Sequence, residues 1–159
     1  VEIIAHAPHR VLRLSFGAGD FSLDMNIRWT MQEDELDYAR AKIATASRAA
    51  RLESPLDTVF IHLGVLEGLR SSSERARNFG FQGKLCIHPE QIEPVNQVFS
   101  PSSEEIEQAQ KYVDAFTAAE ASGSASIQVE GYFIDYPIVE KARRTLDVAK
   151  AIEQSRHRV

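Results

Sequence analysis

The chain has 159 residues, of which 43% are hydrophobic, and its formal net charge is −5. This length and apolar content are sufficient for a domain with a sizeable core. Lys and Arg are interspersed with Asp and Glu, and no stretch reaches the roughly 20 apolar residues of a membrane span. The one cysteine, Cys86, excludes an intramolecular disulfide and favours a reducing compartment. We therefore expect a cytoplasmic protein without nucleic-acid or membrane partners.

The start of the chain is unusual for a domain. The first residue is Val1, and the spacing of Val1, Ile4 and Ala5 is typical of the end of a helix. We therefore expect the chain to be part of a longer polypeptide.

The first part of the chain alternates between apolar runs and helical patterns. Short runs rich in Val, Ile, Leu or Phe predict buried strands at 10–16, 57–63 and 83–89. Helical spacing predicts helices between them, at about 32–52 and 67–79. This alternation indicates an α/β fold in which helices cover a parallel sheet. Because a (β/α)8 barrel takes roughly 250 residues, only its later part would fit here.

The pattern changes after residue 100. Ser102 and Glu105 form the signature of a capping box, and helical spacing follows. Residues 127–134 alternate like a strand, with Gly131 as a hairpin signal, before a final helix from about residue 137. We expect a partial barrel domain at 1–100 and a helix–hairpin–helix lid or oligomerisation segment at 101–159.

A Gly-rich loop, FGAGDFSLDM, follows the first predicted strand at 16–25. Ligands of parallel α/β proteins meet the loops at the carboxyl ends of strands. Gly17 and Gly19 allow close backbone approach, and Asp20 is placed where it could bind a metal; the alternative is a tight turn with a capping Asp. The loop is not a dinucleotide fingerprint, because it lacks the third glycine and no helix is expected to start there.

Two further segments carry candidate functional residues. In CIHPEQ, His88 could act on a substrate, although a His before a helix that starts at Pro89 is more often structural. A Cys/His zinc site is not expected, because Cys86 is the single cysteine. In GYFIDYP, Asp135 lies between an apolar strand and a proline, where it is either a helix cap or an active-site carboxylate.

These segments, taken in order, resemble the second half of the citrate lyase beta subunit-like family of the HpcH/HpaI aldolase superfamily, which includes malyl-CoA and citramalyl-CoA lyases. The resemblance rests on RVLRLSFGAGDF, ELDYARAKIATASRAA, DTVF, GFQGKLCIHPEQIEPVNQVFSPSSEEI and GYFIDYP, and it covers nearly the whole chain. It implies a (β/α)8 barrel of about twice this length, in which the predicted strands are the sixth, seventh and eighth. It also implies a C-terminal lid that reaches into a neighbouring subunit of a homotrimer.

The resemblance further implies a Mg2+-dependent carbon–carbon lyase that cleaves a 3-hydroxy acyl-CoA to an acyl-CoA and a 2-oxo acid. Mg2+ would be held by Asp20 and by a Glu upstream of Val1, where a carboxylate-binding Arg would also lie. Asp135 would be the acid/base that acts in the neighbouring subunit. The residues implied to line the substrate and coenzyme A side are Gly17, Ala18, Gly19, His88 and Pro89.

One stretch departs from this resemblance. His62 stands where relatives commonly have an Asp, and Val65 where they often have a second acid. The change removes negative charge from the mouth of the barrel and could alter substrate choice. The alternatives are an aldolase that acts on free 2-oxo acids and a non-catalytic or repurposed family member. The identity of the acyl-CoA stays undetermined, because malyl and citramalyl groups differ by one methyl. One methyl changes the binding free energy in a pocket by only about 1–3 kcal/mol.

Overall fold

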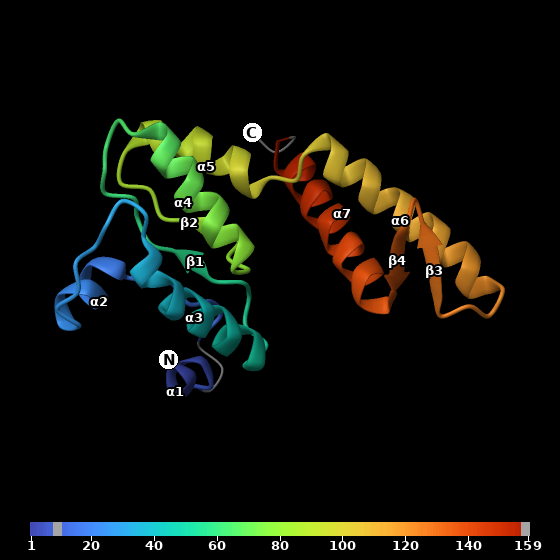
Figure 1. Cartoon of the computed structure of the whole chain (residues 1–159), viewed down its shortest axis with the longest axis horizontal. Helices are drawn as coiled ribbons and strands as arrows, with labels where there is room; N and C mark the ends of the chain where they lie inside the picture. The colour runs from blue at the N-terminus through green and yellow to red at the C-terminus, as the bar shows by residue number, and fades with distance from the viewer. Residues whose placement is uncertain (8–10, 157–159) are drawn as a thin grey trace. The chain divides into compact units, whose positions relative to one another are not determined.

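A computed structural model describes residues 1–7 and 11–156, and the chain divides into two compact units, Val1–Phe99 and Ser100–Val159. Both units combine helices with short strands (Figure 1). Among the described residues, no helix is both long and apolar enough to cross a bilayer.

The first unit contains helices that alternate with short strands. Its elements are α1 (Glu2–Ala5), α2 (Ala18–Asp24), η1 (Asp34–Leu36), α3 (Asp37–Ala49), β1 (Leu56–Asp57), α4 (Leu66–Asn78), β2 (Gly83–Lys84), η2 (Pro89–Gln91) and α5 (Ile92–Phe99). The helices predicted at about 32–52 and 67–79 are present, the first of them divided into η1 and α3. Helical periodicity located them because their buried positions recur on one face.

The strands are parallel, as predicted, but their expected seven-residue length is wrong. β1 pairs with β2 in the register Leu56 opposite Gly83, and Ser15 forms an isolated parallel bridge with Leu56. Arg10, the first residue of the earliest predicted strand, lies outside the described residues. A strand needs a hydrogen-bonded neighbour, which an apolar run does not show, and 58–63 continues without a strand assignment in the described part of the chain. The predicted burial of the runs is also wrong in part, because Ile61, Leu63 and Ile87 are exposed.

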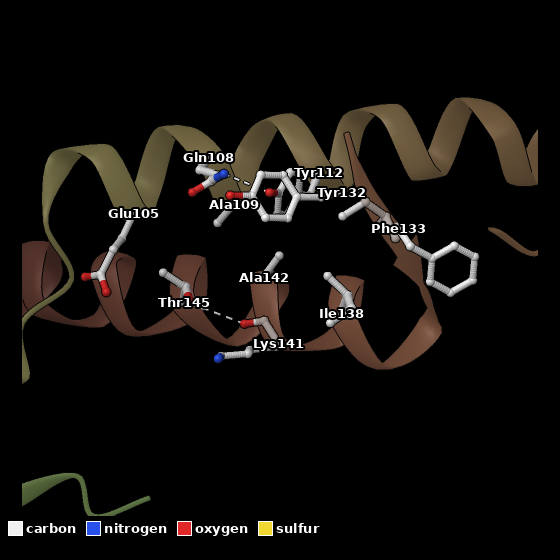
Figure 2. A pocket seen from close by; sticks show the side chains of 11 residues that line it. Glu105, Gln108, Ala109, Tyr112, Tyr132, Phe133, Ile138, Lys141, Ala142 and Thr145 are labelled. Carbon is white, nitrogen blue, oxygen red and sulfur yellow. Dashed lines mark hydrogen bonds between the residues drawn. The ribbon is translucent and has the colours of Figure 1, made fainter. Parts of the chain in front are cut away.

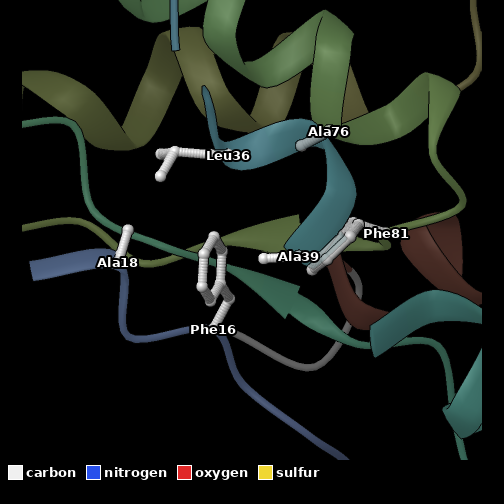
Figure 3. Packing of buried hydrophobic residues seen from close by; sticks show 6 residues of the cluster. All are labelled: Phe16, Ala18, Leu36, Ala39, Ala76 and Phe81. Carbon is white, nitrogen blue, oxygen red and sulfur yellow. The ribbon is translucent and has the colours of Figure 1, made fainter. Parts of the chain in front are cut away.

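The core of this unit lies between the short strands and the helices that follow them. Figure 3 shows the main cluster, which consists of Phe16, Ala18, Leu36, Ala39, Ala76 and Phe81. A second cluster joins Phe60 to Leu69 of α4 and Val95 of α5. Gly68 is required for this approach, because a Cβ there would lie 2.8 Å from Cζ of Phe60. Burial of each large apolar side chain contributes about 1.5–3 kcal/mol.

The second unit is a helix, a hairpin and a helix, as the alternation around Gly131 predicted. Its elements are α6 (Ser103–Ala121), β3 (Ser126–Val129), β4 (Tyr132–Asp135) and α7 (Tyr136–Arg156). The strands are antiparallel, with Val129 opposite Tyr132. The turn between them, Glu130 and Gly131, has positive φ at both residues, which suits the right-handed twist of a hairpin. Its core is formed by Phe116, Ile134 and Val139.

Ser102 and Glu105 form the predicted capping box of α6. The Ser102 hydroxyl accepts from the Glu105 amide at 3.1 Å, and the Glu105 carboxylate accepts from the Ser102 amide at 2.9 Å. We expect Ser102→Ala to lower the free energy of unfolding by about 1 kcal/mol, measured by urea denaturation. Ser103→Ala is the matched control, because Ser103 follows the cap within α6. Equal stability of the two variants would contradict the prediction.

Candidate functional site

The Gly-rich loop leads into a helix, so the expectation that no helix starts there was wrong. α2 begins at Ala18, directly after Gly17, and Asp20 lies in its first turn. Glycines lower helix propensity by about 1 kcal/mol each, which hid the helix in the sequence. Tertiary packing outweighs this preference, because Ala18 is completely buried in the core of the first unit.

Asp20 is an exposed carboxylate on this turn. A Cβ placed on Gly17 would lie 3.7 Å from Oδ2 of Asp20, so the Asp20 carboxylate lies beside the bare backbone of Gly17. A carboxylate oxygen is the ligand type that Mg2+ prefers. Among the described residues, no group of three His, Cys, Asp or Glu side chains is arranged to hold a metal. Asp20 alone could supply one carboxylate ligand and not a complete metal site.

The loop is tied to the next strand by a hydrogen bond. The amide of Ala18 donates to Oγ1 of Thr58 over 3.1 Å, and both residues are buried. Thr58 directly follows Asp57, the last residue of β1. The start of α2 and the end of β1 are thus joined at the edge of the short sheet.

A buried cluster of charges lies behind this edge and was missed by the sequence analysis. Arg40 of α3 donates to both carboxylate oxygens of Asp57, at 3.0 and 3.1 Å, and Lys84 of β2 donates to Oδ2 of Asp57 at 2.6 Å. Arg40 also donates to Glu33 at 2.5 Å, and the Ser72 hydroxyl donates to the same carboxylate at 2.7 Å. These residues, named here the charge cluster, link α3, α4, β1 and β2.

The carboxylates of the charge cluster keep Arg40 ionised. Burial disfavours the charged guanidinium, but hydrogen bonds and charge from Asp57 and then Glu33 outweigh it and raise the pKa of Arg40. The side chains of Arg40, Asp57 and Lys84 are all fully buried. The signal in the sequence was a charged residue at the start of two of the three apolar runs, Asp57 and Lys84, and Arg40 on the apolar stripe of a helix.

In the CIHPEQ turn, the buried side-chain amide of Gln91 joins the segment after β2 to the segment after β1. Gln91 accepts from the Ile87 amide at 2.9 Å and donates to the Phe60 carbonyl at 2.8 Å. His88 is half-buried, and its Nδ1 accepts from the Glu90 amide at 3.3 Å, so it caps the short η2 helix. Pro89 is exposed at the first position of that helix.

His62 lies beside this turn. His62 and His88 line the same cavity of about 10 Å³, together with residues of the Leu63–Leu66 segment. The His62 ring packs edge-on against Phe60, with 5.4 Å between centroids. Within the described part of the chain, its buried Nε2 has no hydrogen-bond partner.

Asp135 lies in the second unit, at the junction of β4 and α7. It is half-buried, and its Oδ1 accepts from the Ile138 amide at 3.3 Å, which is the geometry of a helix cap. One further oxygen of the carboxylate is left for other chemistry. Capping and a catalytic role are therefore compatible in this residue.

An open pocket of about 340 Å³ lies near this junction, between α6, β4 and α7 (Figure 2). Its lining residues are Glu105, Gln108, Ala109, Tyr112, Tyr132, Phe133, Ile134, Ile138, Lys141, Ala142 and Thr145. Tyr132 and Phe133 of β4 are more than half exposed, at 63% and 66%. The hairpin thus presents aromatic side chains to solvent close to Asp135.

Comparison with known proteins identifies relatives of this chain. Residues 1–89 match the HpcH/HpaI aldolase/citrate lyase family. The citrate lyase subunit beta of Leuconostoc mesenteroides subsp. cremoris is 37% identical over 148 residues, which cover 93% of this chain and 49% of that protein. The mitochondrial citramalyl-CoA lyase of Homo sapiens is 32% identical over 139 residues, covering 87% of this chain and 41% of the enzyme.

A solved structure gives the same result. CitE from Mycobacterium tuberculosis, crystallised with magnesium, acetoacetate and coenzyme A, matches with a TM-score of 0.77 and 26% identity over 94% of this chain and 55% of that chain. The chain thus spans about half the length of the relatives that it matches, and it shares the mixed α/β fold of citrate lyase beta-like proteins. It belongs to the HpcH/HpaI aldolase/citrate lyase family.

Proposed function

We propose that this chain supplies the sixth to eighth strands of a (β/α)8 barrel and a C-terminal lid of a Mg2+-dependent carbon–carbon lyase. The substrate is a 3-hydroxy acyl-CoA of the malyl-CoA or citramalyl-CoA type, and the products are an acyl-CoA and a 2-oxo acid. The observation that carries the proposal is the exposed carboxylate of Asp20, which lies in the first turn of a helix directly after the chain leaves the parallel sheet. The complex of a related protein with magnesium, acetoacetate and coenzyme A supports the same chemistry.

Asp20 would hold the metal together with a Glu upstream of Val1, and water and substrate oxygens would complete the ligand set. Mg2+, when bound, would polarise the carbonyl of the 2-oxo acid and stabilise the substrate alkoxide from which that carbonyl forms. Gly17, Ala18 and Gly19 allow the substrate to approach the backbone, since two of the three carry no side chain. His88 and Pro89, at the turn after β2, line the side on which coenzyme A binds.

Asp135 moves the proton. As the carbon–carbon bond breaks, the 3-hydroxyl of the substrate gives up one proton and becomes the carbonyl of the 2-oxo acid. The thioester enolate left on the acyl-CoA product takes up one proton at its α carbon from a positioned acid. In the reverse direction the Asp135 carboxylate removes that proton. The lid brings this residue to the active site of a neighbouring subunit in a cytoplasmic homotrimer, and the exposed aromatic residues of β4 support such a contact.

We expect Asp20→Ala, in the complete protein, to abolish Mg2+ binding measured by isothermal titration calorimetry, and turnover with it. Asp24→Ala is the matched control, because Asp24 is an exposed carboxylate at the other end of the same helix. Unfolding by urea should be nearly unchanged in both variants, since neither side chain is buried. Wild-type Mg2+ affinity in Asp20→Ala would remove this residue from the metal site.

Product analysis separates the proposed lyase from its alternatives. Malyl-CoA and citramalyl-CoA are offered alongside a free 4-hydroxy-2-oxo acid, and the 2-oxo acid released is measured. Release only from the thioesters supports the lyase. Release from the free acid without coenzyme A would favour the aldolase. Intact Mg2+ binding without turnover of any of them would favour a repurposed family member.

A further inference from the structure

The helix that carries Asp20 is capped from another part of the chain. The first amides of a helix have no partner inside it, and a capping side chain usually supplies the acceptor. Gly17, at the cap position of α2, has no side chain that could do so. The amide of Ala18 instead donates to the hydroxyl of Thr58, 3.1 Å away and 40 residues later in the sequence. Thr58 therefore supplies the acceptor that a capping side chain at position 17 would otherwise supply to α2.

This hydroxyl is held in place by the charge cluster. Asp57, the residue before Thr58, accepts hydrogen bonds from Arg40 and from Lys84. The backbone amide of Leu56 donates to the Leu14 carbonyl, which fixes β1, the strand that leads to Thr58, beside the extended segment that leads to α2. Thr58 itself is only 2% exposed, so its hydroxyl has little freedom to turn away.

The bond determines where Asp20 lies. Ala18 is the first residue of α2 and Asp20 is the third, so both belong to one turn. If the Ala18 amide lost its acceptor, a buried donor would be left without a partner, and the turn would shift to find water. The carboxylate would then move with the turn.

We propose that Thr58 is a positioning residue for Asp20, and that its hydroxyl sets the affinity of the site for Mg2+. The inference rests on the proposed function, because it takes Asp20 as a metal ligand. Groups that orient a metal ligand typically contribute about 10–100-fold to metal affinity. Thr58 belongs to this class although it contacts the backbone of the loop and not the metal.

The test uses the complete protein and measures Mg2+ affinity by isothermal titration calorimetry, with the Mg2+ dependence of turnover as a second readout. Thr58→Val keeps the shape of the side chain and removes the hydroxyl, and it should weaken Mg2+ binding by roughly 10–100-fold. The kcat at saturating Mg2+ should recover most of its wild-type value, because the reacting groups are intact. Thr58→Ser keeps the hydroxyl and should bind Mg2+ nearly as the wild type does.

Ser73→Ala is the control for the loss of a buried hydroxyl elsewhere in the unit, since Ser73 is fully buried and donates only within α4, to the Leu69 carbonyl. It should leave Mg2+ affinity unchanged. If Thr58→Val does not fold, Thr58→Ser and Thr58→Ala form the comparison, because they differ only in the hydroxyl.

The outcomes are separable from those of the proposed function. Wild-type Mg2+ affinity in Thr58→Val, or equal affinity of the Ser and Ala variants, overturns the positioning role while Asp20→Ala still loses binding. A loss of affinity in Ser73→Ala as large as in Thr58→Val also overturns it, because the effect would then follow from stability. Retained binding in Asp20→Ala overturns the proposed function instead.

Discussion

Asp135→Asn is expected to leave folding and assembly intact and to lower kcat by roughly 10²–10⁴-fold. Asn caps a helix about as well as Asp, so the hydrogen bond from the Ile138 amide at 3.3 Å can persist in the variant. An amide has no carboxylate to exchange a proton with carbon, so the chemical step is lost. The measurement is steady-state turnover of the proposed acyl-CoA substrate by the complete protein, with circular dichroism and sedimentation to show that fold and assembly are unchanged.

The proposed action of Asp135 across a subunit interface has its own test. Mixtures of Asp135→Asn and Asp20→Asn subunits should regain part of the activity, because some sites would then combine an intact Asp20 with an intact Asp135 from a neighbour. Glu140→Gln is the control, since Glu140 is an exposed carboxylate on α7, the helix that Asp135 caps, and it pairs with Arg143. Near-normal turnover by Asp135→Asn removes the catalytic role, and an inactive mixture with proven subunit exchange removes the action across the interface.

Asp57→Ala is expected to be the most destabilising single change in the charge cluster. It leaves the buried guanidinium of Arg40 and the buried ammonium of Lys84 without their shared carboxylate. Removal of one partner from a buried ion pair costs about 3–5 kcal/mol. This is a large share of the roughly 5–15 kcal/mol that stabilises a folded domain. The measurement is the urea midpoint of unfolding, or the soluble yield if the variant does not fold.

Two graded variants make this result interpretable. Lys84→Met leaves Asp57 paired with Arg40 and should therefore cost less than Asp57→Ala. Glu130→Ala removes the partner of Lys111 in an ion pair that is about half exposed, and it should cost at most about 1 kcal/mol. If Asp57→Ala were no more destabilising than Glu130→Ala, the charge cluster would have no structural importance.

The helices α3, α4, α6 and α7 and the hairpin could be predicted from the sequence, because each carries its own local signal, whereas α2 could not. The capping box at Ser102 and the turn at Gly131 involve residues a few positions apart, and α3 and α4 have clear helical periodicity. Strand length could not be predicted, because it depends on which neighbour pairs with each segment. Phe60, three residues after Asp57, is buried against Leu69 of α4 and Val95 of α5, but the ladder with β2 ends at Asp57.

The surroundings of the candidate site were harder to predict than its residues. Asp20 and Asp135 were found through short motifs, and their roles stay predictions. The bond between Ala18 and Thr58 spans 40 residues, and the pairing of Arg40 with Asp57 spans 17. No local pattern specifies such contacts, although a charged residue within an apolar run indicates that a buried partner must exist somewhere in the fold.

Glu33 shows how the charge cluster constrains sequence change. Its backbone is left-handed, with φ 57 and ψ 22, a conformation that glycine adopts more easily than any other residue. Yet Glu33 is only 1% exposed, and its carboxylate accepts hydrogen bonds from both Arg40 and Ser72. Glycine at position 33 would adopt the left-handed backbone without strain, but Arg40 would lose one of its carboxylate partners. An aspartate would keep the backbone strain, and its shorter side chain would not reach Arg40. Divergence at positions 33 and 40 should therefore be coupled, so that relatives which lose one of the two charges lose the other as well.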